Sequence, residues 1–169
     1  LLPFGTMNKM RATLTNNDSG RFECRWINLK VEPKSKCVFL NNLTMQQFNN
    51  GLLSFQVAHG EGKFFANNET IEAIEQSSLV VFRYVDDKGK PNQKYPDNPN
   101  GSLQAIAGIC DTTGRILGLM PHPERFVRIE QHPNWRRMKM KTFTHRSFSE
   151  GGQGLPIFEN MIKYIKQTL

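Results

Sequence analysis

The chain has 169 residues, of which 38% are hydrophobic and 22% charged, and a formal net charge of +7 at pH 7. This composition is typical of one globular domain with a sizeable core and excludes a disordered chain. No apolar run approaches the ~20 residues of a membrane-spanning helix, and we recognise no secretory signal pattern at residue 1. Three scattered cysteines form neither a disulfide framework nor a zinc-binding spacing, so we expect a cytoplasmic protein.

The hydrophobic pattern alternates between strands and helices without internal repeats. Apolar runs bounded by turn residues predict strands at residues 22–31, 37–40, 52–58, 78–85, 103–109 and 115–120. Capping residues and helical spacing predict helices at residues 44–50, 67–76 and 156–167. The turn at residues 111–114 should join the last two strands as a hairpin. The order of these elements indicates a single α/β domain over residues 1–169.

Positive charge is concentrated near the end of the chain. Residues 125–146 hold seven basic side chains and one acid, Glu130. We expect residues 127–153 to form a basic loop, and three interpretations of it stay open: a solvated loop, a contact surface for an acidic partner or a substrate phosphate, and a nucleic-acid surface with stacking aromatic residues. Because no nucleic-acid module signature occurs elsewhere in the chain, the first two are favoured.

The most informative stretch follows the last predicted strand. His122 lies between Pro121 and Pro123, whose rings fix φ at about −65°, and Glu124 follows two residues later. A histidine at the end of a buried strand, with a carboxylate close by, is arranged as a base with an orienting partner. The alternative is a solvated or structural histidine, because paired titratable groups are often structural.

A wider resemblance favours the catalytic interpretation. The stretch Met120-Pro121-His122-Pro123-Glu124 resembles the Pro-His-Pro-Glu signature of class I glutamine amidotransferases. Residues 17–26, 56–63 and 95–102 are similar, in the same order, to the glutaminase part of phosphoribosylformylglycinamidine synthases, and residues 154–160 to its terminal helix. The resemblance runs over most of the chain.

The resemblance implies a fold and a set of roles. The fold would be a flavodoxin-like, mostly parallel sheet flanked by helices, with an added β-hairpin. His122 would be the general base, and Glu124 would hold its imidazole. The turn His59-Gly60-Glu61-Gly62 would line and support the glutaminase pocket. From chemistry alone this turn could also be a second acid/base pair, a hydrogen-bonded loop or a metal site, but no third ligand has helpful spacing, and we expect no metal. His132 and His145 fit no motif and should be exposed.

One departure from the family pattern concerns the nucleophile. The family places a cysteine in a Gly-x-Cys-x-Gly elbow, and no such elbow occurs in this chain. Cys24 and Cys37 are predicted to be small buried residues of strands. Cys110 is followed by a hairpin turn and no helix, so we expect none of the three to be the nucleophile. We therefore expect residues 1–169 to be an incomplete domain that needs an N-terminal half carrying the nucleophile.

The activity implied by the resemblance is the release of ammonia from glutamine. A synthetase domain or subunit of the same enzyme would use that ammonia to convert formylglycinamide ribonucleotide to its amidine in purine biosynthesis. This chain has no phosphate-cradling Gly-rich loop, so ATP and Mg²⁺ are expected in the synthetase partner. The alternative is a noncatalytic module that keeps the amidotransferase framework and docks an acidic partner through its basic segment.

Overall fold

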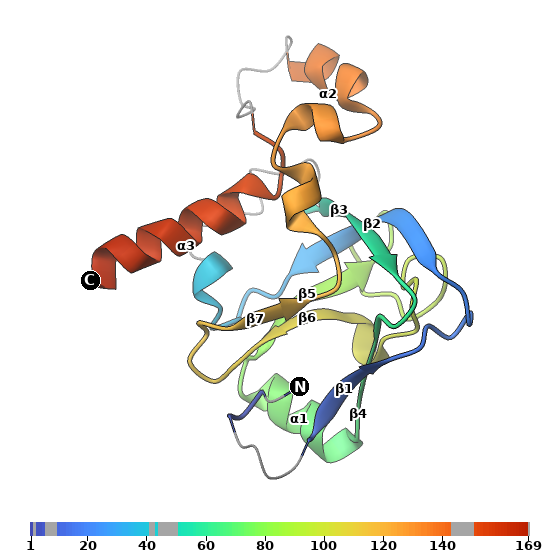
Figure 1. Ribbon diagram of the computed structural model, residues 1–169, viewed down its shortest axis with the longest axis vertical. Helices are drawn as coiled ribbons and strands as arrows, with labels where there is room; N and C mark the ends of the chain where they lie inside the picture. The colour runs from blue at the N-terminus through green and yellow to red at the C-terminus, as the bar shows by residue number, and fades with distance from the viewer. Residues whose placement is uncertain (2, 6–9, 41–42, 44–50, 143–150, 169) are drawn as a thin grey trace.

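The computed structural model describes residues 1, 3–5, 10–40, 43, 51–142 and 151–168. Five strands form a curled sheet in the order β3-β2-β5-β6-β7, and β1 pairs with β4 in a second, two-stranded sheet (Figure 1). The strands are β1 (Ala12–Thr15), β2 (Glu23–Val31), β3 (Leu53–His59), β4 (Lys63–Ala66), β5 (Val80–Val85), β6 (Ile106–Cys110) and β7 (Leu117–Leu119). The helices are α1 (Asn68–Gln76), α2 (Trp135–Thr142) and α3 (Leu155–Thr168). Short 3₁₀ turns are η1 (Val38–Leu40), η4 (Leu103–Ala105), η5 (Pro123–Phe126) and η6 (Ile129–Gln131).

Side-chain alternation explains where the core lies. In β3, Leu53, Phe55 and Val57 are fully buried, whereas the residues between them are partly exposed. This period-2 pattern turns one face of the strand toward the core. Helix α1 buries Ile71 and Ile74 as its spacing predicts, and the Asn67 side chain accepts a hydrogen bond from the Thr70 N–H at 2.9 Å to cap it.

One short stretch bridges the two edges of the curled sheet. The Met120 N–H donates to the Ala107 carbonyl of β6, and the His122 N–H donates to the Gln56 carbonyl of β3, which is the opposite edge strand. Proline has no N–H, so His122 provides the only backbone donor of Pro121-His122-Pro123. This N–H bonds to the Gln56 carbonyl at the place where the two edges of the curled sheet meet, which we call the seam of the sheet. The fold therefore fixes the His122 backbone between β7 and β3.

The mixed α/β class and the added hairpin are confirmed. The described strands differ from a mostly parallel sheet, because every one of their pairings is antiparallel. The connection from β6 to β7 spans only residues 111–116, which suits antiparallel neighbours and is too short for a parallel crossover. The strand predicted at residues 37–40 is wrong: the Leu40 N–H bonds to the Cys37 carbonyl and closes a 3₁₀ turn. The helix predicted at residues 44–50 lies outside the described residues.

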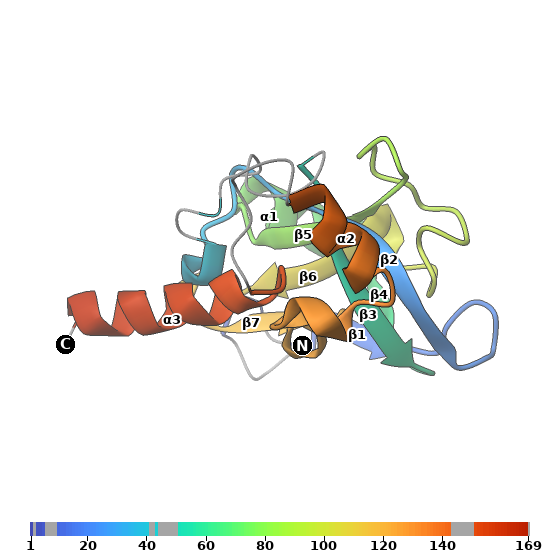
Figure 2. The same ribbon diagram turned by 90° about the horizontal axis from the view of Figure 1, so that it is seen from above.

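The described residues of the basic segment, 127–142 and 151–153, are more ordered than the predicted loop. They include η6 and the helix α2, which Figure 1 shows as a small lobe standing away from the sheet and Figure 2 shows from above, in front of the sheet. The prediction failed because the helix carries few apolar residues, and its charged run resembles a solvated loop. The same figures show α3 running out from the body toward the C-terminus. Among the described helices, none has the length and apolarity needed to cross a bilayer.

Candidate functional site

His122 and Glu124 form a hydrogen-bonded pair at the seam of the sheet. The His122 Nδ1 atom lies 2.6 Å from the Glu124 Oε1 atom, and 29% of the His122 side chain is exposed. A carboxylate can only accept, so it favours the tautomer that carries the proton on Nδ1. The Nε2 lone pair is then available as a base. The pairing predicted from sequence is therefore present in the structure.

Local backbone geometry explains this contact. His122 has extended dihedral angles (φ −103°, ψ 90°), as expected for a residue before proline, and Pro123 opens the 3₁₀ turn η5. The turn brings Glu124 back over His122. At its end, the Phe126 ring is 1% exposed and meets Trp26 of β2 edge-on, with ring centroids 5.5 Å apart. That aromatic anchor holds η5 on the sheet.

A second set of contacts joins the pair to β3. Besides accepting from the His122 N–H at 2.8 Å, Gln56 accepts through its Oε1 atom from Arg125 Nη1 at 3.4 Å. Gln56 lies in the strand predicted at residues 52–58, but its contacts with the His122 segment were not predicted. His122 and Arg125 are 66 and 69 residues away from Gln56 in the sequence, and no local pattern reports a contact at that separation. His132 is also half-buried against Trp26, at a centroid distance of 4.4 Å, so its predicted exposure is wrong; His145 lies outside the described residues.

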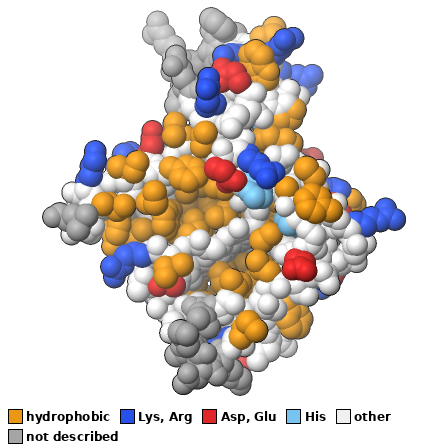
Figure 3. Space-filling model, viewed as in Figure 1, with side chains coloured by type: hydrophobic (Ala, Val, Ile, Leu, Met, Phe, Trp, Pro, Cys, Tyr) orange, Lys and Arg blue, Asp and Glu red, His pale blue; other side chains and the backbone are white. Residues whose placement is uncertain are grey.

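An apolar hollow adjoins the pair. Figure 3 shows hydrophobic side chains around this hollow, with histidine side chains close to its edge. A cavity of about 140 Å³ on β6 and β7 is lined by Gly62 from the predicted glutaminase turn and by Met120, two residues before His122. The turn at residues 59–62 and the His122 segment therefore border one hollow.

His59 lies in a buried polar network rather than in the hollow. Its Nδ1 atom lies 3.1 Å from Asn17 Oδ1, and its Nε2 atom lies 3.5 Å from Asn100 Nδ2. The Asn100 amide also donates to the Gly62 carbonyl and to the Tyr84 hydroxyl. Burial lowers the pKa of His59, and the nearby His122 lowers it further, whereas the Glu23 carboxylate opposes the shift. A neutral imidazole with both nitrogens occupied is a structural residue.

The remaining residues of this turn have distinct positions. The Gly60 carbonyl accepts from the Asn17 N–H at 2.9 Å, and Glu61 is exposed to solvent. Gly62 is packed against the His59 ring, because a Cβ atom there would lie 2.3 Å from His59 Nδ1. The glycine is therefore required for close packing. A pocket role for residues 59–62 stays a prediction, and the network explains how the turn keeps its shape.

Comparisons with known proteins place this geometry in a family. Residues 1–165 match the family described as the CobB/CobQ-like glutamine amidotransferase domain. The chain belongs to this family. It is 45% identical over 168 residues to phosphoribosylformylglycinamidine synthase subunit PurQ of Dehalococcoides mccartyi, covering 99% of this chain and 58% of that protein. A Methanococcus maripaludis protein of the same name is 37% identical over 171 residues, with 98% of this chain and 59% of the relative covered.

One solved structure agrees with the family assignment. The structure of PurLQS from Thermotoga maritima matches with a TM-score of 0.58 and 27% identity, covering 94% of this chain and 55% of that one. The chain thus spans somewhat more than half the length of these relatives.

The three cysteines of this amidotransferase chain all lie in described segments. Cys37 and Cys110 are buried, and a hydrogen bond from Cys110 together with burial raises the pKa of the Cys37 thiol. Cys24 is exposed, which corrects the predicted burial, and its Sγ atom lies 3.6 Å from Gln56 Nε2. It is the second residue of β2, so it does not lie in a turn between a strand and a helix. The prediction that none of them is the nucleophile stands untested.

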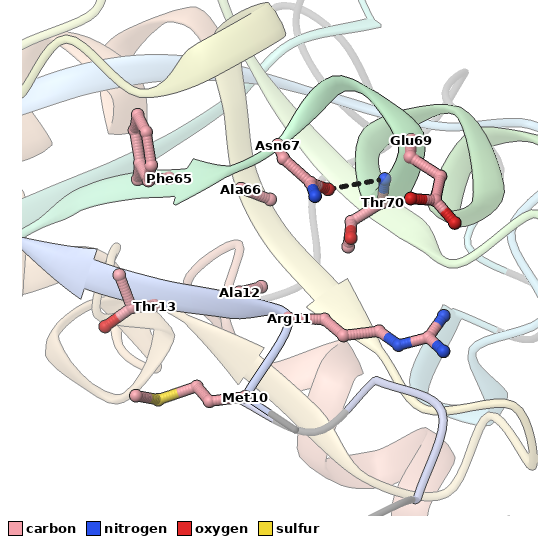
Figure 4. Close-up of a pocket in the computed structure, with 9 residues that line it drawn as sticks. All are labelled: Met10, Arg11, Ala12, Thr13, Phe65, Ala66, Asn67, Glu69 and Thr70. Carbon is pink, nitrogen blue, oxygen red and sulfur yellow. Dashed lines mark hydrogen bonds between the residues drawn. The ribbon is translucent and has the colours of Figure 1, made fainter.

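A second pocket of this amidotransferase chain lies elsewhere. A hollow of about 310 Å³ lies between β1, β4 and the start of α1, and Figure 4 draws the residues that line it. Its lining includes Arg11, Phe65 and Glu69, and none of its lining residues belongs to the His122 pair or to the His59 network. In the part of the chain that the structure describes, no three His, Cys, Asp or Glu side chains are grouped so as to hold a metal ion.

Burial of His59 predicts a pH-dependent stability. The unfolded chain takes up a proton on this residue near the ordinary pKa of 6.5, whereas the folded form resists protonation to lower pH. The free energy of unfolding should therefore be highest above about pH 6.5 and fall as the pH decreases toward the lowered folded pKa. Urea unfolding between about pH 7.5 and 5.5 measures this slope, which cannot exceed about 1.4 kcal/mol per pH unit for one group.

His59→Gln is the matched variant for this measurement. It should flatten the slope, and the remainder should come from His132, whose pKa is also lowered by burial. An unchanged slope in His59→Gln would contradict the buried, neutral state of His59.

Proposed function

We propose that this chain is the glutaminase part of a phosphoribosylformylglycinamidine synthase. The observation that carries the proposal is the 2.6 Å contact between His122 Nδ1 and Glu124 Oε1, in a chain of the glutamine amidotransferase family. The names of its relatives supply the enzyme class. The substrate of this part would be glutamine.

His122 would move protons through its free Nε2 atom. It would take the proton from a cysteine thiol, and the resulting thiolate would attack the side-chain amide carbon of glutamine. His122 would return the proton to the leaving nitrogen, which departs as ammonia. Water would then hydrolyse the thioester with His122 again as the base, which releases glutamate and restores the thiol.

Glu124 would act through His122. Its carboxylate holds the imidazole in the tautomer with a proton on Nδ1 and stabilises the imidazolium that forms during each proton transfer. Because 55% of its side chain is exposed, solvent weakens the charge interaction, and orientation of the ring is the larger contribution.

We also propose that the nucleophile is supplied from outside residues 1–169. The positions of the three cysteines support this, since Cys37 and Cys110 are buried and Cys24 lies within β2 rather than in a turn between a strand and a helix. The ammonia would pass to a synthetase partner in the cytoplasm, where ATP and Mg²⁺ would bind. The solved assembly named PurLQS supports a partner of this kind.

The lobe around α2 favours a second candidate function, docking of an acidic partner. Arg136 and Arg137 are exposed on this helix, and the lobe stands away from the sheet (Figure 1). Glu130 pairs with Lys139 at 2.7 Å, and Arg136 and Arg137 add further positive charge, so the lobe is positive overall. A docking module could do this without any hydrolysis of glutamine.

Labelling with a glutamine-mimicking chloroketone separates the two functions. In the full-length protein, we expect one cysteine to be alkylated, and peptide mapping should place it outside Cys24, Cys37 and Cys110. Cys24→Ser should label as fast as the parent protein, because the proposed nucleophile is a different cysteine. Alkylation of Cys24 would overturn the assignment of the nucleophile, and complete resistance to the reagent would favour the docking module.

A further inference from the structure

The segment Gly151-Gly152-Gln153-Gly154 contacts two elements: the turn η5, which carries Glu124, and the strand β3, which binds the His122 backbone. It precedes α3 and runs alongside η5, which carries Glu124. The Gly152 N–H donates to the Val127 carbonyl at 2.9 Å, and the Gly154 N–H donates to the Phe126 carbonyl at 2.8 Å. The segment is thus hydrogen-bonded to the end of η5.

Two glycines allow this approach. A Cβ atom on Gly152 would lie 2.3 Å from the Phe126 carbonyl oxygen, and one on Gly154 would lie 2.0 Å from the Pro123 carbonyl oxygen. Both obstacles are backbone atoms, which cannot rotate away as a flexible side chain could. Residues 152 and 154 therefore touch the backbone of η5 at its first and last positions.

Gln153 connects the same segment to β3. Its Oε1 atom accepts from the Ser54 N–H at 2.6 Å, and its Nε2 atom donates to the Leu52 carbonyl at 3.4 Å. The Gln153 side chain is buried, with 8% exposed. Ser54 lies two residues before Gln56, whose carbonyl accepts from the His122 N–H. A single side chain therefore ties the Glu124 turn to the strand that holds His122.

We propose that Gln153 is a positioning residue for the His122–Glu124 pair, and this inference rests on the proposed glutaminase function. His122 is fixed by β3 through Gln56, whereas Glu124 is fixed by η5. The 2.6 Å contact between them depends on how η5 sits on β3. Gln153, with Gly152 and Gly154 on either side, sets that placement through contacts with both elements.

A change in this placement should affect turnover more than binding. Misplacement of a catalytic group by about 1 Å can cost on the order of 100-fold in rate. Gln153 is buried and bonds to the backbone at the start of β3, so its loss removes no exposed side chain that could contact glutamine directly. The expected effect is a lower kcat for glutamine hydrolysis with little change in KM.

The test uses the full-length protein together with its synthetase partner. Gln153→Ala should lower kcat for glutamine hydrolysis by about tenfold or more, with KM within about twofold and ammonia-dependent synthesis retained. Gln153→Glu keeps an oxygen that accepts from the Ser54 N–H and should lose less activity. Gln167→Ala, at the exposed end of α3, is the matched control and should behave as the parent protein.

The outcomes distinguish a failure of the positioning role from a failure of the proposed glutaminase function. A parent protein that hydrolyses no glutamine would overturn the proposed function itself. If the parent protein is active and Gln153→Ala keeps its kcat, the positioning role is wrong. Loss of ammonia-dependent synthesis in Gln153→Ala, equal to the loss with glutamine, would indicate general damage to the fold and would also contradict the positioning role.

Discussion

Replacement of His122 by asparagine is expected to abolish glutamine-dependent amidine synthesis while ammonia-dependent synthesis continues. The His122 Nε2 atom is the free base of the pair, because Nδ1 is bound to Glu124. Loss of a general base costs about 10²–10⁴-fold, and more when the base also activates the nucleophile. Asparagine is similar in size to one side of the imidazole, and the backbone N–H that bonds to Gln56 is kept.

The measurement is the rate of product formation by the full-length protein and its synthetase partner, with glutamine or an ammonium salt as nitrogen donor. Ammonia-dependent synthesis is the internal control, since it requires the synthetase but not the base. Equal loss of both activities would show that His122 supports the fold or the assembly rather than proton transfer.

Glu124→Gln should give the second largest effect, a fall of about 10²–10⁴-fold in glutaminase turnover with glutamine binding less affected. The amide keeps the size of the side chain and can still hydrogen-bond, but it has no negative charge to stabilise the imidazolium. It can also present its NH₂ group to Nδ1 and so favour the wrong tautomer.

Steady-state measurements of glutamine hydrolysis give kcat and KM for Glu124→Gln. Glu130→Gln is the matched control, because Glu130 is exposed on η6 and binds Lys139 rather than a histidine. Turnover of Glu124→Gln within about twofold of the parent protein would make Glu124 an ordinary surface acid.

Local patterns predicted much of the fold. The apolar run at residues 52–58 and the capped stretch at residues 67–76 predicted β3 and α1 to within one residue at each end. Both signals come from residues that are close together in the sequence, so they can be recognised without knowledge of the fold. The turn after Cys110 was found for the same reason, since Asp111 accepts from the Arg115 and Ile116 N–H groups within its own loop.

Elements that depend on distant partners were missed. The pair β1–β4 joins Ala12 to Ala66, and each strand has only four residues, too few for periodicity to show. The apolar run at residues 38–40 resembles a strand, but the Val38 N–H bonds to the Gly114 carbonyl and the run turns as η1. Tertiary contacts decided both outcomes.

The contacts of the candidate site also fall into two groups, those between neighbours in the sequence and those between distant residues. Pro121, His122, Pro123 and Glu124 are adjacent in sequence, so their contact follows from the constraints of proline and from one 3₁₀ turn. The supports of this pair are Gln56 and Gln153, which come from residues far apart in the chain. A glutamine in a strand or before a helix carries no local sign of such a role.

The most direct test of the His122–Glu124 pairing is a double-mutant cycle on single-turnover hydrolysis of glutamine by the full-length protein. It compares His122→Asn, Glu124→Gln and the double variant with the parent protein. Because Glu124 is proposed to act through His122, the double variant is expected to match His122→Asn alone within about twofold. A double variant slower than His122→Asn by the full factor that Glu124→Gln causes on its own would show that the two residues act independently, which contradicts a base with an orienting carboxylate.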